Sequence, residues 1–115
     1  MTNETPSPTI TLNDYQRKTA ATAIYPHDQG VAYTALGLAG EAGEVANKCK
    51  KLLRGDKARA QLRKELEKEL GDVLWYAARL AAELDLSLDQ IARANLDRLA
   101  DRQQRDTLTG DGDDR

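Results

Sequence analysis

Apolar residues recur through most of the chain at the three- and four-residue spacing of amphipathic helices. The pattern predicts four helices, at about residues 12–24, 31–54, 56–85 and 88–105. Thr11 and Ser87 each open a sequence typical of a helix N-terminus, and Pro26 ends the first helix. Gly55 is the expected residue after the second helix, and Asp56 is the expected N-cap of the third. So short a connection indicates an antiparallel helix pair.

The composition favours an all-α protein. With 115 residues the chain is long enough for one domain, and 31% of its residues are charged while only 4% are aromatic. Good helix formers dominate, and runs of β-branched residues are absent. Such helices bury a small core, so we expect an antiparallel bundle of about four helices that oligomerisation completes. The expected helical domain spans residues 11–106, between a flexible N-terminal tail at 1–10 and a Gly- and Asp-rich C-terminal tail at 107–115.

Charge and cysteine content exclude several classes of protein. The net charge of -2 gives no basis for a nucleic-acid-binding surface. No apolar run approaches the roughly 20 residues that a membrane span needs, and the polar N-terminus is unlike a signal peptide. The single cysteine, Cys49, rules out an internal disulfide and fits a reducing compartment. We therefore expect a cytoplasmic protein without a nucleic-acid or membrane partner.

Two pairs of carboxylates share one design. Glu41 and Glu44 lie three residues apart in the second expected helix. Glu69 and Asp72 have the same spacing in the third. Side chains at this spacing point to one side of a helix, one turn apart. Steps of about 100° per residue place each pair along the edge of the apolar stripe of its helix. Glu41 precedes Gly55 by as many residues as Glu69 follows it, so the hairpin brings the two pairs to one height.

Four carboxylates beside an apolar core repel one another. Two carboxylates about 5 Å apart repel by roughly 3 kcal/mol at an effective dielectric near 20. A divalent cation relieves this repulsion at neutral pH, and carboxylate oxygens are the ligands that Mg²⁺ and Mn²⁺ prefer. The alternative is that the acids belong to solvated helix faces, the ordinary role of acidic residues at helical spacing. Their matched heights and their position beside the core favour the metal site.

Basic and amide side chains recur at helical spacing in the second and fourth expected helices. Lys48 follows Glu44 by one turn, where it either forms an intrahelical ion pair or binds phosphate beside the metal. In the fourth helix Asn95 falls inside the apolar face, and Arg98 and Arg102 extend the line from it. These three residues either form a buried hydrogen bond next to a solvated basic face or bind phosphate oxygens, for which arginine is suited.

The acidic segments and their surroundings resemble the paired motif of the MazG-like nucleotide pyrophosphohydrolases, an all-α superfamily. The motif stands here as Glu41-Ala-Gly-Glu44, a gap of 24 residues and Glu69-Leu-Gly-Asp72. Its surroundings are the Leu-Gly-Leu-Ala-Gly segment at 36–40, the continuation Asp72-Val-Leu-Trp-Tyr76, and Asn95-Leu-Asp-Arg98-Leu99 with Arg102. The resemblance extends from about Tyr15 to Arg105.

The resemblance implies a helical bundle that forms a homodimer or homotetramer. It also implies hydrolysis of a ribo- or deoxyribonucleoside triphosphate to the monophosphate and pyrophosphate, with Mg²⁺ as cofactor and Mn²⁺ as a substitute. The implied catalytic residues, which are also the implied metal ligands, are Glu41, Glu44, Glu69 and Asp72. The implied substrate-binding residues are Lys48, Asn95, Arg98 and Arg102.

Other functions stay open at this point. One alternative within the same class is a pyrophosphatase specialised for dUTP, dCTP, a modified nucleotide or phosphoribosyl-ATP. The alternative outside this class is a non-enzymatic helical interaction module, for which Glu41→Gln and Glu69→Gln would change little. In a pyrophosphohydrolase the same substitutions would abolish activity and leave the fold intact. A di-iron carboxylate bundle is disfavoured because it uses Glu-x-x-His motifs, and the chain has none.

Overall fold

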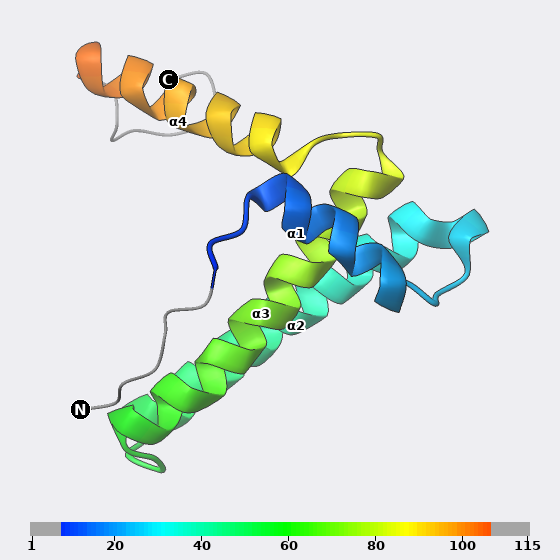
Figure 1. Cartoon of the computed structure of the whole chain (residues 1–115). Coiled ribbons are helices and arrows are strands. Elements are labelled where there is room, and N and C mark those ends of the chain that lie inside the picture. Colours follow the sequence, from blue (N-terminus) through cyan, green and yellow to red (C-terminus); the bar gives the residue numbers. More distant parts are fainter. Residues whose placement is uncertain (1–7, 107–115) are drawn as a thin grey trace.

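The computed structural model describes residues 8–106, and it confirms the all-α class. The four helices are α1 (Leu12–Thr19), α2 (Gly30–Leu53), α3 (Arg59–Glu83) and α4 (Leu88–Gln104). Short 3₁₀ helices at Ala20–Thr22 and His27–Gln29 lie between α1 and α2 (Figure 1). The expected C-terminal tail at 107–115, and residues 1–7 of the expected N-terminal tail, lie outside the described residues.

The expectation that the first helix reaches about residue 24 and is ended by Pro26 is wrong, because α1 ends at Thr19 and the chain tightens into a 3₁₀ helix at Ala20–Thr22. Three other helix ends follow the local sequence. Thr11 Oγ1 accepts a hydrogen bond from the Asp14 amide at 3.0 Å, and Ser87 Oγ accepts one from the Gln90 amide at 3.3 Å, as expected for N-caps. Gly55 follows α2 with φ of 82°, the left-handed conformation that glycine adopts without strain. These ends are therefore encoded locally.

The expectation that Asp56 caps α3 is wrong. The helix begins at Arg59, and its N-cap is Ala58, which makes no side-chain capping bond. The Asp56 amide instead donates to the Lys51 carbonyl at 2.9 Å, which closes the C-terminus of α2 in a Schellman motif. Its carboxylate accepts from the Arg54 side chain at 2.9 Å, so both groups of Asp56 serve the end of α2.

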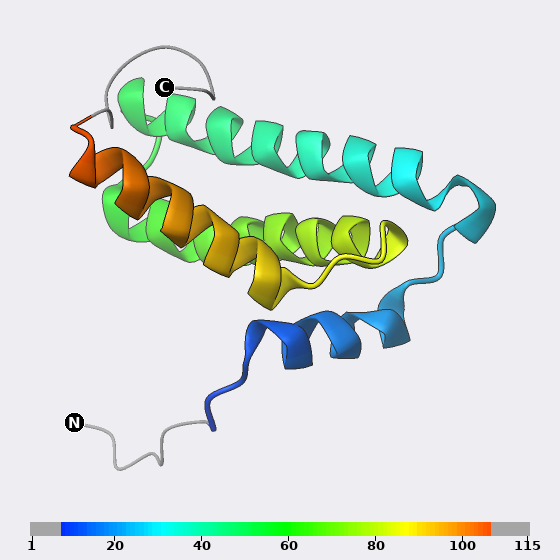
Figure 2. The ribbon, with the colours of Figure 1, turned by 90° about the horizontal axis from the view of Figure 1, so that it is seen from above.

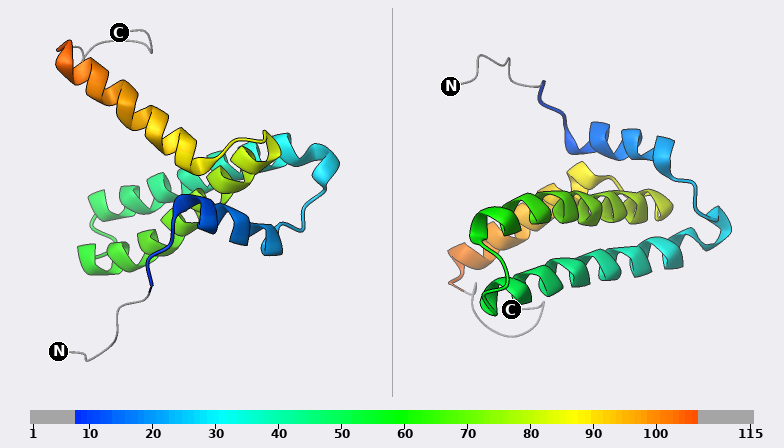
Figure 3. Two further views of the ribbon diagram at one scale, coloured as in Figure 1. Left: turned by 45° about the horizontal axis from the view of Figure 1, so that its top comes forward. Right: turned by 90° about the horizontal axis from the view of Figure 1, so that it is seen from below.

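The two long helices form the antiparallel hairpin that the short connection indicated, and they lie side by side in every view (Figures 1, 2 and 3). α1 packs across the half of α3 that is distant from the hairpin turn. The small core there consists of Ala78, Ala81 and Leu88, with Tyr15 of α1 packed against it. Gln16 fixes this packing because its side chain donates to the Leu86 carbonyl and accepts from the Leu88 amide, both at 2.8 Å.

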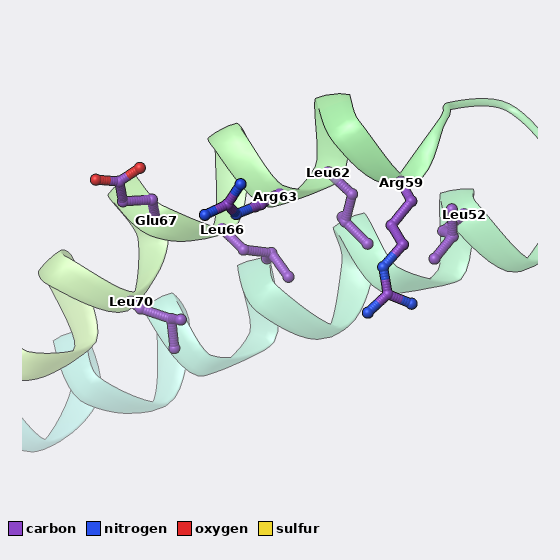
Figure 4. A pocket seen from close by; sticks show the side chains of 7 residues that line it. All are labelled: Leu52, Arg59, Leu62, Arg63, Leu66, Glu67 and Leu70. Atoms are coloured by element: carbon purple, nitrogen blue, oxygen red, sulfur yellow. The ribbon is translucent and has the colours of Figure 1, made fainter. Parts of the chain in front are cut away.

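The fourth helix packs against α1 and leans away from the hairpin (Figures 1 and 3). As a result, apolar side chains on both elements stay accessible: Leu70 of α3 is 55% exposed and Leu96 of α4 is 60% exposed. A groove runs along the hairpin beside α3 (Figure 4), lined by Leu52, Arg59, Leu62, Arg63, Leu66, Glu67 and Leu70. Among the described residues, no helix has the length and apolar character that crossing a membrane requires.

Candidate metal centre

Three of the four expected acidic ligands come together between the long helices. Glu41 of α2 meets Glu69 and Asp72 of α3, and one carboxylate oxygen of each lies within 4.8 Å of the others. Glu69 is buried, with 9% exposure, while Glu41 and Asp72 are half-buried. The hairpin turn at Gly55 therefore sets the two helices at the register that the sequence indicated.

The electrostatics of Glu41 reflect this crowding. Partial burial raises the pKa of its carboxyl above the ordinary value, and a hydrogen bond with Glu69 raises the pKa further. The negative charges of Asp72, Glu69 and Glu44 add to the effect. An ionised cluster of this kind is unfavourable by itself, and a divalent cation coordinated by its oxygens would offset the repulsion. The donor set of hard carboxylate oxygens fits Mg²⁺ or Mn²⁺.

Glu44 lies outside this group of three. Its side chain is exposed, because the step of three residues from Glu41 turns it about 60° around α2. It stays close enough for its charge to raise the pKa of Glu41. Glu44 thus stands at the rim of the cluster.

Lys48 reaches across the hairpin to this cluster. Its Nζ lies 3.6 Å from Oε1 of Glu69, and the two side chains are 22% and 12% exposed. Of the two roles that the sequence left open for Lys48, the structure replaces the intrahelical pair with Glu44 by this pair with Glu69, and the phosphate-binding role stays a prediction. The lysine faces the buried acid of the neighbouring helix.

Sequence reasoning missed an aromatic group at the edge of the cluster. The ring of Tyr76 lies against α2 at Gly37, where any Cβ would overlap it. Burial raises the pKa of Tyr76, as do Tyr33 and, to a smaller extent, the charges of Glu41 and Asp72. The signal was present in the sequence, since Tyr76 follows Asp72 by four residues and so lies on the same side of α3.

Further aromatic rings extend this group toward the N-terminus of α2. Tyr33 stacks on Tyr25, with ring centroids 5.0 Å apart and an angle of 15° between the planes. Trp75 meets the ring of Tyr76 edge-on, with centroids 5.0 Å apart. A cluster of aromatic rings therefore adjoins the acids through Tyr76.

The expected phosphate ligands of α4 do not join the acids of their own chain. Asn95 and Arg98 are exposed and line a groove with Leu74 of α3. Leu74 follows Asp72 by two residues, about 200° around α3, so this groove faces away from the cluster. Arg102 is 4% exposed and lies further along α4. The substrate-binding role of these three residues stays a prediction.

Comparison with known proteins adds a family and one relative. The family model described as the MazG nucleotide pyrophosphohydrolase domain matches residues 29–106, which contain both acidic pairs. The chain is 43% identical over 109 residues to the gene 37 protein of Mycobacterium phage L5, an alignment that covers 88% of this chain and 96% of the phage protein. No solved structure matches the chain significantly.

Proposed function

Since the chain belongs to the MazG nucleotide pyrophosphohydrolase family, we propose that it hydrolyses nucleoside triphosphates to the monophosphate and pyrophosphate in a reaction that needs Mg²⁺, with Mn²⁺ as a substitute. The observation that carries the proposal is the meeting of Glu41, Glu69 and Asp72 between the two helices that the family match covers. A cluster of carboxylates alone is common on protein surfaces. Here it is partly buried, assembled from two helices and placed in a family of this chemistry.

The acidic residues have distinct roles in this proposal. Glu41, Glu69 and Asp72 hold the ion, and Glu44 at the rim completes its ligands or orients the attacking water. When bound, the ion would neutralise phosphate oxygens and make a water nucleophilic at neutral pH. The chain itself fixes the carboxylates on two packed helices, so they are positioned before the nucleotide arrives.

The aromatic rings beside the acids are suited to the other end of the nucleotide. Tyr33 is 43% exposed and Tyr76 lies next to it, with ring centroids 6.5 Å apart. Bases stack on aromatic side chains with little sequence preference. This surface supports a nucleotide substrate. The preferred base is a question for an assay across different nucleoside triphosphates.

A second copy of the chain is the proposed occupant of the exposed apolar surface. A two-fold interface requires a surface that complements itself. The α3 groove has this property, since Leu66 and Leu70 line it while Arg63 and Glu67 flank it one turn apart (Figure 4). Two antiparallel copies of α3 would place Arg63 of each copy opposite Glu67 of the other. A homodimer, or a tetramer built from two of them, buries the leucines and completes the core.

The dimer also offers a role for α4. Because this helix leans away from the acids of its own chain, the exposed Asn95 and Arg98 are proposed to serve the acids of the other copy, whereas Arg102, with 4% exposure, stays a predicted substrate-binding residue. Their amide and guanidinium groups would bind phosphate oxygens, with arginine able to bind them in a bidentate manner. Lys48 supplies a further positive charge from the hairpin itself.

The proposal is tested by measuring pyrophosphate release from all common ribo- and deoxyribonucleoside triphosphates with Mg²⁺, with Mn²⁺ and with EDTA. We expect metal-dependent release that Glu69→Gln abolishes while circular dichroism stays unchanged. Asp97→Asn removes an equal charge from the exposed face of α4 and serves as the matched control. If a folded protein that binds Mn²⁺ releases nothing across the panel, the substrate is a modified nucleotide. If it also binds no metal, the chain is an interaction module and the proposal is wrong.

A further inference from the structure

The ion pair between Lys48 and Glu69 joins a residue proposed to bind phosphate to a residue proposed to bind metal. We propose that Lys48 is an internal counter-cation of the metal site: it neutralises Glu69 while no divalent ion is bound, and it must leave this carboxylate when an ion binds. Its ammonium group then becomes available to the substrate's phosphates. This inference rests on the proposed function and deepens it, since it concerns how the site is kept stable without metal.

The geometry makes Lys48 a competitor for the site. Of the three clustered acids, Glu69 is the buried one, and an unpaired carboxylate there is the most costly. Lys48 Nζ lies 3.6 Å from its Oε1. An ion coordinated by that oxygen at about 2.1 Å would stand at most about 6 Å from the ammonium group. Like charges at this distance in a partly buried site repel strongly, so lysine and metal cannot both stay on Glu69 at low cost.

The ion pair is also loose enough to exchange. A distance of 3.6 Å exceeds the range of an N–H···O hydrogen bond, so Lys48 neutralises Glu69 without being held by directional bonding. The neighbouring pair on the same hairpin differs, because Lys57 donates a hydrogen bond to Glu65 and its side chain is 8% exposed. Lys57 is therefore buried and hydrogen-bonded, whereas Lys48, with 22% of its side chain exposed, has room to turn toward solvent.

The direction in which Lys48 turns gives it a second role. On α2 it follows Glu44 by one turn, and Glu44 stands at the exposed rim of the cluster. A flexible four-carbon stem allows the ammonium group to move from Glu69 to this rim. Phosphates that approach the acids from solvent meet that rim first. Lys48 thus acts on the buried carboxylate in the metal-free protein and on the substrate in the loaded one.

The test measures Mn²⁺ binding by titration calorimetry on the full chain without nucleotide. We expect Lys48→Met to bind Mn²⁺ about tenfold more tightly than the wild type, because competition and repulsion are both removed. Lys50→Met is the matched control, since Lys50 is exposed and lies about 200° around α2 from Lys48. It makes the same change in net charge, and we expect its Mn²⁺ affinity to stay within twofold of the wild type.

A second titration adds inorganic tripolyphosphate to Mn²⁺-saturated protein, and here we expect Lys48→Met to bind it about tenfold more weakly. Lys48→Gln keeps a polar side chain in case the methionine variant fails to fold. Unchanged or weaker Mn²⁺ binding in folded Lys48 variants would show an ordinary structural ion pair and overturn the inference, while leaving the proposed function intact. Absence of Mn²⁺ binding in the wild type would overturn both.

Discussion

Gly37 is the position where packing beside the candidate metal centre is most sharply testable. A Cβ at this position would overlap three atoms of the Tyr76 ring. Gly40 and Gly43 lie in the same helix and have no neighbouring atoms within 4 Å of such a Cβ. The three glycines therefore share one backbone conformation and differ in what a methyl group would meet.

The magnitudes separate the two effects. Alanine is more favourable than glycine inside a helix by about 1 kcal/mol, and this gain applies at all three positions. Overlap with a packed ring costs about 1–3 kcal/mol. Gly40→Ala should therefore stabilise the protein by up to about 1 kcal/mol. Gly37→Ala should be less stable than Gly40→Ala by about 1–3 kcal/mol, because the propensity term cancels in the comparison.

The assay is urea unfolding followed by circular dichroism, with all variants at one protein concentration because oligomers gain stability with concentration. Tyr76→Ala in the background of Gly37→Ala supplies the cross-check. We expect the overlap cost to disappear in this double variant, which a double-mutant cycle measures directly. If Gly37→Ala stabilises the chain as much as Gly40→Ala does, the Tyr76 ring does not lie against Gly37 and the described edge of the site is wrong.

Three further predictions concern the N-cap of α4, the hydrogen bond between Tyr25 and Glu83, and the proposed α3 interface. Ser87→Ala should lower the free energy of unfolding by about 1 kcal/mol, measured by urea denaturation, since it removes the N-cap of α4. The hydrogen bond from Tyr25 at 2.5 Å lowers the pKa of the Glu83 carboxyl. The stability that this bond contributes is therefore present above the ordinary glutamate pKa and lost as the pH falls through the lowered pKa of Glu83. Tyr25→Phe should make thermal stability less sensitive to acid. Arg63→Glu should shift the dimer toward monomer in sedimentation, and the exchange Arg63→Glu with Glu67→Arg should restore it; an unchanged monomer fraction in the single variant would refute the α3 interface.

The features that depend on local interactions could be predicted from the sequence. The caps at Thr11 and Ser87 are bonds between residues three apart, and the turn at Gly55 follows from its left-handed backbone. Equal spacing around that turn was enough to bring Glu41 to Glu69. Asp56 was misassigned because capping preference favours it, while the Schellman closure of α2 already uses its amide.

Tertiary packing decided the rest. The direction of α4 depends on its contact with α1, and no periodic pattern in α4 alone specifies it. Lys48 had an acidic neighbour on its own helix, yet it faces Glu69 because the hairpin brings a more buried carboxylate within reach. The close fit of Tyr76 on Gly37 is likewise a contact between two helices. Helix propensity disfavours glycine inside a helix, so propensity alone gives no reason for the glycine at this position.

The most direct test of the central claim is the identity of the products formed from a nucleoside triphosphate with Mg²⁺. Chromatography of the nucleotide together with separate assays for pyrophosphate and orthophosphate distinguishes the reactions. The account predicts one monophosphate and one pyrophosphate per turnover, with no diphosphate, and loss of both products in Glu69→Gln. Release of orthophosphate with a nucleoside diphosphate, or undiminished turnover in Glu69→Gln, would contradict it.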